Sequence, residues 1–475
     1  MPRPATSAVG LVTLMLALLP ALSGCVHYRA QKLEPEKTLA AFEERSLTNS
    51  NLRTFLAASD SRLPANPPKW DLDALTLVAF YYHPNLDVAR AQWNAATAAI
   101  GTAKGRPNPT VGLIPGYSFN PPDGISPWLP SVTYDLPIET AGKRNKRTIR
   151  AQQLSTAARL NIVSTAWQVR SAVRASLLDL AAATEREKAL QAQMQTQQTI
   201  LQLMEQRLQA GAVAPSELYP ARVSVLRVRS DLVDLRRQLA DARARLADSL
   251  GVPLKAIVST EFAFPIEIPG KWEELASPAV RKEALHARAD LLGALADYEA
   301  AEAGLRLEIA RQYPDIHLGS TYQWDQGENK WQLGVTVELP LLNRNEGPIA
   351  EAEAKRTEVA ARFTALQAKA ISEIDRATAT RDAILGQLKE AEHIVEADRQ
   401  QLATLEASLK AGAVDRVEVE TAAMELRSSE LVLLDLKIKA QQALGLLEDA
   451  LQRPFDSLKN IEVDPKRPAQ KAARK

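Results

Sequence analysis

The segment Leu208-Gln209-Ala210-Gly211-Ala212-Val213 recurs as Leu409-Lys410-Ala411-Gly412-Ala413-Val414, displaced by 201 positions. Each copy follows a very long alanine-rich stretch, and a glycine just after the last turn of a helix takes the left-handed conformation that ends it. A second stretch with helical character begins directly after each copy. We therefore predict two antiparallel helical hairpins, each made of a very long helix that folds back through a short turn.

The recurrence extends well beyond these turns. His83-Pro84-Asn85-Leu86 matches Arg288-Ala289-Asp290-Leu291 at a displacement of 205, and Leu136-Pro137 matches Leu339-Pro340 at 203. A near-constant displacement predicts an internal two-fold repeat whose halves are built in the same order. As α-helix, each long segment would span roughly 100 Å. The seven-residue rhythm typical of coiled coils is seen in the row Leu388, Ala391, Val395, Asp398, Leu402, Leu405 and Leu409.

Alanine is absent from two windows, residues 104–140 and 311–349. The second window alternates, so that Ile316 and Leu318 would face one side of a strand while His317 and Gly319 face the other. Each window predicts a hairpin of strands about 9–11 residues long, with the pattern of outer-membrane barrel strands. A soluble hairpin that caps a helical bundle is the alternative. Four strands cannot close a barrel and open sheet edges are not tolerated in hydrocarbon, so membrane insertion would require a ring of two or more copies.

The N-terminus carries the pattern of a secretory signal, with Arg3 followed by an apolar run from Ala8 to Leu22. It ends in Leu22-Ser23-Gly24-Cys25, which looks like a bacterial lipobox and predicts lipidation of Cys25. The next residue, Val26, resembles lipoproteins that are sorted to the outer membrane. The alternative is an ordinary signal peptide with a chance cysteine.

The composition excludes several classes of protein. The formal charge of +1 lacks the basic excess of nucleic-acid binders. The single cysteine rules out a disulfide scaffold, and the five histidines are scattered without ligand spacing, so we expect no metal site and no cofactor. Gly142-Lys143-Arg144 lacks the glycine spacing and the Ser/Thr of a phosphate loop, and no nucleophile motif is present. We expect no enzymatic activity.

Together these features resemble the TolC family of outer-membrane factors, the exit ducts of tripartite efflux and type I secretion systems. The resemblance covers residues 72–454 and rests on Leu75-Thr76-Leu77, His83-Pro84-Asn85-Leu86, Arg106-Pro107-Asn108-Pro109, Leu136-Pro137 and the two Ala-Gly-Ala-Val turns. It implies a mainly helical homotrimer, with a twelve-strand β-barrel in outer-membrane lipid and a helical tunnel (α-barrel) in the periplasm. It also implies two protein partners, a periplasmic adaptor (membrane fusion) protein and an inner-membrane pump of the RND type. Residues 138–144 further resemble the CzcC-like cation-efflux branch, where a Gly-Lys-Arg run follows the second strand.

On this basis the chain divides into a signal peptide (1–24), a lipidated N-terminal segment (25–70) and two repeats joined by an equatorial linker (254–277). Repeat 1 occupies 71–253, with a β-hairpin at about 108–137 and long helices at about 141–210 and 215–250. Repeat 2 occupies 278–454, with a β-hairpin at about 314–340 and long helices at about 345–411 and 415–452. The basic tail 455–475 is expected to be disordered.

The resemblance also assigns roles to the two helical turns. In the family these turns face the adaptor and close the tunnel, and here they are Gly211, Ala212, Val213, Gly412, Ala413 and Val414. The family's acidic gate position, six residues after each glycine, holds Glu217 and Glu418. A second acidic site is Thr421 here and a basic partner is Val414, so a ring of glutamates is the part of the gate that is kept. Alternatively, each glutamate only stabilises the first turn of its helix.

A basic cluster, Lys143, Arg144, Lys146 and Arg147, starts the first long helix, where the helix dipole disfavours cations. Because it follows a predicted barrel strand directly, it would lie at the membrane interface and contact anionic headgroups. A solvated helix face is the alternative.

Two functions remain open at this point. The first is a passive exit duct that conducts substrates such as heavy-metal cations. This duct would lie in the cell outer membrane, with a lipid anchor and a periplasmic helical extension. The second is a periplasmic coiled-coil lipoprotein, structural or adaptor, without a pore and held only by Cys25.

Overall fold

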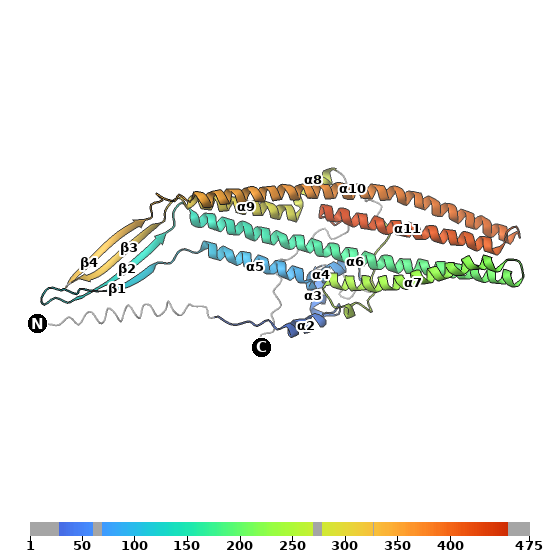
Figure 1. Ribbon diagram of the computed structural model, residues 1–475, viewed down its shortest axis with the longest axis horizontal. Helices are drawn as coiled ribbons and strands as arrows, with labels where there is room; N and C mark the ends of the chain where they lie inside the picture. Colours follow the sequence, from blue (N-terminus) through green and yellow to red (C-terminus); the bar gives the residue numbers. More distant parts are fainter. Residues whose placement is uncertain (1–27, 60–68, 269–277, 326, 455–475) are drawn as a thin grey trace. The chain divides into compact units, whose positions relative to one another are not determined.

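A computed structural model describes residues 28–59, 69–268, 278–325 and 327–454, drawn as a ribbon in Figure 1. The chain divides into two compact units, residues 1–44 and 45–475. The first contains helix α2 (Pro35–Glu43), none of whose residues is buried. The second contains α3 (Ser50–Ser59), α4 (Leu72–Tyr82), α5 (Pro84–Lys104), β1 (Thr110–Tyr117), β2 (Trp128–Ile138), α6 (Lys143–Gln209), α7 (Pro215–Leu250), η1 (Leu254–Ala256), α8 (Pro278–Ala287), α9 (Ala289–Ala310), β3 (Ile316–Asp325), β4 (Glu328–Val337), α10 (Glu346–Lys410) and α11 (Arg416–Leu451).

Two helical hairpins dominate the second unit. Helix α6 has 67 residues and packs along α7, while α10 has 65 and packs along α11 (Figure 1). At the end of α6, Gly211 has φ 74° and the Ala212 N–H donates to the Arg207 carbonyl at 2.9 Å. At the end of α10, Gly412 has φ 73° and the Ala413 N–H donates to the Ser408 carbonyl, also at 2.9 Å. Both turns therefore have the left-handed glycine cap that the sequence predicts.

Helix α6 is the common neighbour of the other long helices. It contacts α5 and α9 in its first part and α7 and α11 in its second, and α9 and α11 in turn contact α10. In the part of the chain that the structure describes, α7 packs along one long helix only, and it meets α4 near its own end. The free side of α7 is thus an edge of the helical layer.

The largest hydrophobic core lies around α4, which enters between α6 and α7. Every residue of α4 from Ala74 to Tyr82 is buried, as expected for a helix that is apolar on all sides. Leu75 and Val78 pack in the same core as Val173 of α6 and Leu246 of α7. This core joins the short helices of the first half to its long hairpin.

The four strands form one antiparallel sheet in the order β1-β2-β3-β4. Within it, β2 pairs with β3, so the two hairpins are joined although they are far apart in the sequence. Strands β1 and β4 are the edges, each with one side unpaired among the described residues. Left-handed residues lead from strands into the long helices: Ala141 (φ 52°) and Gly142 (φ 68°) before α6, and Asn345 (φ 61°) before α10.

The prediction of a mainly helical chain with a small antiparallel sheet is confirmed. None of the described helices combines the length and the apolar character needed to cross a membrane.

Candidate functional site

The sheet has one apolar and one polar face. The register places Leu113 opposite Val132, Val132 opposite Tyr322, and Tyr322 opposite Trp331, so apolar side chains continue across all four strands. On the edge strands the apolar side chains are exposed, for example Leu113 at 70%, Trp331 at 74% and Leu333 at 77%, whereas Val132 and Tyr322 on the central strands are half-buried. Soluble proteins rarely leave so continuous an apolar surface open to water.

Aromatic pairs mark the turn end of each hairpin. The ring centroids of Tyr117 and Trp128 are 5.2 Å apart, and those of Tyr322 and Trp331 are 5.1 Å apart. Each pair joins residues directly opposite one another on neighbouring strands. Rings of aromatic residues at the edge of an apolar band are a feature of outer-membrane barrels.

The opposite face of the sheet is polar. It carries Thr133 and Asp135 on β2, His317 and Thr321 on β3, and Gln332 on β4. His317 Nδ1 lies 2.9 Å from Asp135 Oδ2. In a closed barrel this face would line the interior.

The basic cluster lies at the junction of sheet and helices. The Lys143 Nζ donates to Asp315 Oδ1 at 2.8 Å, and the Thr140 N–H donates to the same oxygen at 2.9 Å. Burial on its own would raise the pKa of Asp315, but these hydrogen bonds outweigh it and hold that pKa below its ordinary value. Arg147 pairs with Glu139 at 2.6 Å. Lys143 and Arg147 therefore tie the end of β2 and the start of β3 to α6.

The cluster also caps a second helix, α5. Arg144 Nε donates to the Lys104 carbonyl at 2.8 Å, and Arg147 donates to the Ala103 and Gly105 carbonyls at 3.0 and 2.9 Å. Cations that look misplaced at the start of α6 thus satisfy the last carbonyls of α5, where the helix dipole favours them. Lys146 bonds the Ala141 carbonyl at 2.6 Å. These side chains are engaged within the chain, so a freely solvated helix face does not describe them.

The two candidate gate glutamates are exposed in the first turns of α7 and α11. Glu217 Oε1 accepts a hydrogen bond from the Ala214 N–H at 2.9 Å, so this carboxylate stabilises the start of α7. The corresponding cap of α11 is Asp415, whose Oδ1 accepts from the Val417 and Glu418 N–H groups at 2.7 and 3.1 Å. Within the described part of the chain, the Glu418 carboxylate at the tip makes no hydrogen bond or ion pair.

An ion pair that the sequence analysis missed joins the two hairpin tips. Arg207, in the last turn of α6, pairs with the Asp415 carboxylate at the start of α11. Positions 201 residues away hold Ser408 and Ala214, which cannot form this pair. This difference in charge between matched positions of the two halves was the feature of the sequence that could have indicated the ion pair.

A buried polar cluster joins the middle of α6 to the last turns of α11, away from the hairpin tips. The Glu448 Oε2 lies 3.1 Å from Arg170 Nη1 and 3.2 Å from Arg174 Nε, and all three side chains are at most 7% exposed. Arg174 also donates to the Gln441 carbonyl and side-chain oxygen at 2.9 and 3.1 Å. Gly445 lies beneath Arg174, whose guanidinium leaves no room for a Cβ at that position. The cluster fixes the two halves of the chain against each other.

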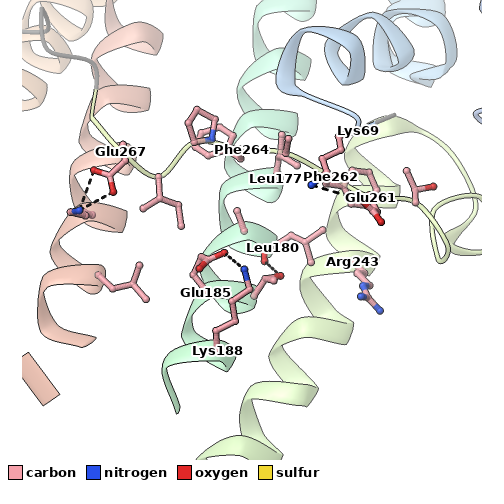
Figure 2. Close-up of a pocket in the computed structure, with 18 of the residues that line it drawn as sticks. Lys69, Leu177, Leu180, Glu185, Lys188, Arg243, Glu261, Phe262, Phe264 and Glu267 are labelled. Atoms are coloured by element: carbon pink, nitrogen blue, oxygen red, sulfur yellow. Dashed lines mark hydrogen bonds and ion pairs between the residues drawn. The ribbon is translucent and has the colours of Figure 1, made fainter. Parts of the chain in front are cut away.

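An open pocket of about 860 Å³ lies where the segment 260–267 crosses α6 between α7 and α11, and Figure 2 shows the residues that line it. Gln441 holds this segment by donating to the Pro265 and Glu267 carbonyls at 3.1 and 2.8 Å. The charged groups at the pocket include the ion pairs Lys437–Glu267 at 2.9 Å and Lys188–Glu185 at 2.6 Å (Figure 2).

Within the described residues, no group of three or more His, Cys, Asp or Glu side chains is arranged to hold a metal ion. Cys25, the signal peptide 1–24 and the tail 455–475 lie outside the described residues.

The chain is similar to known proteins over most of its length. The family described as outer membrane efflux protein matches residues 80–252 and 280–451. The cobalt-zinc-cadmium resistance protein CzcC of Cupriavidus metallidurans is 23% identical over 286 residues, which make up 59% of this chain and 65% of CzcC.

Several solved structures share the fold, among them two outer-membrane proteins. The outer membrane protein VceC of Vibrio cholerae has a TM-score of 0.66 at 20% identity, covering 81% of this chain and 97% of VceC. The CmeC outer membrane channel of Campylobacter jejuni has a TM-score of 0.65 at 14% identity, covering 90% of this chain and 93% of CmeC. Since the family match includes both helical hairpins and all four strands, the chain belongs to the outer membrane efflux protein family.

Proposed function

We propose that this chain is the outer-membrane exit duct of a tripartite efflux system. Three copies form a homotrimer whose strands close a twelve-strand barrel and whose helical hairpins form a periplasmic tunnel. A periplasmic adaptor connects the tunnel to an inner-membrane pump of the RND type, and the pump supplies the energy. The duct conducts passively, without catalysis and without a cofactor.

The observation that carries this proposal is the two-faced sheet with unpaired edges. An exposed apolar face is costly in water and favourable in lipid. Unpaired backbone groups at β1 and β4 are costly in lipid, so β4 of one copy must pair with β1 of the next until the ring closes. Bacterial barrels have an even number of strands, eight or more, so three copies of a four-strand sheet satisfy this requirement.

We assign the remaining sequence features within this assembly. Cys25 carries the lipid anchor in the outer membrane, and the repeats 71–253 and 278–454 each contribute one barrel hairpin and one tunnel hairpin. The tip turns at 211–213 and 412–414 face the adaptor. Glu217 and Glu418 lie near the closing end of the tunnel, where converging carboxylates would attract cations. The basic cluster at 143–147 lies where the barrel meets the tunnel, close to the inner lipid surface.

Heavy-metal cations are the proposed cargo. The name of the relative CzcC, a cobalt-zinc-cadmium resistance protein, supports this choice. The His317–Asp135 pair on the polar face would add groups that bind such cations weakly as they pass.

Single-channel recording in a planar lipid bilayer tests the proposal. The purified protein should insert and conduct, and mass photometry in detergent should give three copies. The variant Cys25→Ser should remain in the outer-membrane fraction after a high-salt wash, because the barrel holds the protein without its lipid. Release of that variant as a soluble protein would favour the periplasmic lipoprotein without a pore.

A further inference from the structure

Helix α7 contains a proline close to its start. It is one continuous helix, and Pro220 lies inside it, five positions after the first residue. Proline has no N–H, so the Ser216 carbonyl, four positions earlier, receives no helical hydrogen bond, and the proline ring crowds that carbonyl. Sharp bends in helices are found at such positions. Pro220 therefore separates a short α7 tip segment, residues 215–219, from the α7 shaft, residues 221–250.

The α7 tip segment is held against the end of α6. Leu218 is buried, at 2% exposed, and α6 is the long helix along which α7 packs. The Glu217 N–H donates to the Ala214 carbonyl at 3.0 Å, and the Glu217 carboxylate accepts from the Ala214 N–H at 2.9 Å. The end of α6 is in turn tied to the start of α11 by the ion pair of Arg207 with Asp415. The tip segment should therefore move with these groups rather than with the α7 shaft.

The second hairpin has the matching helix without the interruption. The position 201 residues after Pro220 holds Thr421, and α11 contains no proline. Thr421 has the N–H that Pro220 lacks, and its hydroxyl also donates to the Val417 carbonyl at 2.7 Å. Glu418 therefore belongs to an unbroken helix, whereas Glu217 lies on the tip side of a weak point. Because the two hairpins share one fold, the proline is an addition to the first hairpin and not a requirement of the fold.

The position of α7 gives this weak point a consequence for the whole assembly. Within one copy α7 packs along α6, and in the proposed trimer its other side borders the next copy's α10. A change in the angle of the α7 shaft therefore alters the junction between copies. With a weak point at Pro220, the shaft changes its angle while Leu218 keeps its packing and Arg207 keeps its ion pair.

We propose that Pro220 is a hinge at which the α7 shaft bends against the hairpin tip when the tunnel opens. The proposal rests on the proposed function, since it is a tunnel closed by hairpin tips that needs such a movement. Each copy then bends α7 at the junction with its neighbour, while α11 stays unbent. Glu217 and Glu418 remain together at the tip, because the Arg207–Asp415 pair joins the two hairpins there.

Amide hydrogen exchange, measured by mass spectrometry on the full-length protein in detergent micelles, tests the hinge. The two segments to compare are residues 221–226 of α7 and the matched residues 422–427 of α11. In the wild type, the α7 segment should exchange roughly tenfold faster, because its hydrogen bonds lie next to the missing one. The variant Pro220→Ala restores the N–H and should slow this exchange roughly tenfold. Alanine is the best helix former, so this variant is expected to fold.

The matched control gives α11 the same interruption. Thr421→Pro should speed exchange in residues 422–427 and leave the α7 segment as it is in the wild type. Channel recordings on the same preparations test whether the hinge acts in opening. Pro220→Ala should make transitions between closed and open levels roughly threefold rarer, because the stiffened helix bends less often. Ser230→Ala, at an exposed position of the same helix, should leave these transitions unchanged.

Two results overturn the proposal. One is that Pro220→Ala does not slow exchange in the α7 segment, and the other is that it slows exchange but leaves the transitions unchanged. A wild-type protein that never conducts refutes the duct instead, and the exchange measurement still decides whether Pro220 is a hinge.

Discussion

Placing a lysine on either face of strand β4 tests which face meets lipid. Leu333 lies in the middle of β4, on the apolar face and opposite Ser320, and is 77% exposed. Its neighbour Gln332 points to the polar face, opposite Thr321. The variants Leu333→Lys and Gln332→Lys therefore add the same charge one residue apart, on opposite faces of one strand.

The expected difference is large. A lysine facing lipid near the middle of the bilayer costs about 2–4 kcal/mol, whereas a lysine facing a water-filled interior costs little. In an insertion equilibrium this is roughly a 30- to 900-fold difference for each copy of the chain. Because each closed ring contains several copies of β4, the assembled channel should magnify the difference.

Folding into lipid vesicles, measured over a urea titration, reports this equilibrium. We expect Leu333→Lys to lose the heat-modifiable, protease-resistant form at much lower urea than Gln332→Lys, which should stay close to the wild type. Equal behaviour of the two variants would refute the lipid-facing assignment and favour the soluble hairpin that caps a helical bundle.

Three further predictions concern the helical part. Glu448→Ala should destabilise the protein by about 3–5 kcal/mol, because it leaves two buried arginines uncompensated. Glu430→Ala should have little effect, because Glu430 is only half-buried and its partners Arg399 and Arg427 are exposed to water; thermal unfolding followed by circular dichroism compares the two variants. Burial raises the pKa of Asp449 above its ordinary value, so the stability of the wild type should fall as pH rises through that raised pKa, and the variant Asp449→Asn should show no such fall. The melting temperatures of both proteins, measured between pH 4 and 8, test this. Parallel plots of melting temperature against pH for the two proteins would contradict it. Arg207→Ser removes the ion pair with Asp415 between the hairpin tips and should raise channel open probability roughly two- to threefold, an effect as small as an exposed ion pair implies; an unchanged open probability in planar bilayers would show that this pair does not restrain the tip.

Local rules account for the parts of the fold that were predicted from sequence. The left-handed glycines at the two turns, the coiled-coil rhythm of α10 and the alternation of β3 each depend on residues within a few positions of one another. Leu388, Ala391 and Val395 of the predicted row are buried as expected, at 8%, 6% and 2% exposed. Such patterns identify an element and its inner face, but they do not identify the element that packs against it.

The side-chain contacts that position the site depend on such pairings and could not be predicted. Arg147 contacts carbonyl groups that end α5, more than 40 positions earlier in the chain, so its role as a helix cap is invisible in its own segment. Glu448 lies 278 positions from Arg170, and the heptad pattern gives no reason to place the two helices together. In both cases the sequence shows the charge, and only the tertiary structure shows its partner.

The differences between the two halves carry functional information that their common fold does not. In the proposed trimer, six hairpins surround the tunnel and two kinds of junction alternate around it. At the junction within each copy, Arg207 and Asp415 join α6 to α11. At the junction between copies, α10 would meet the next copy's α7, and the corresponding positions are Ser408 and Ala214, which carry no charge. This ion pair would therefore tie the ring at every second junction, and the hairpin tips should separate first between copies, where the pair is missing.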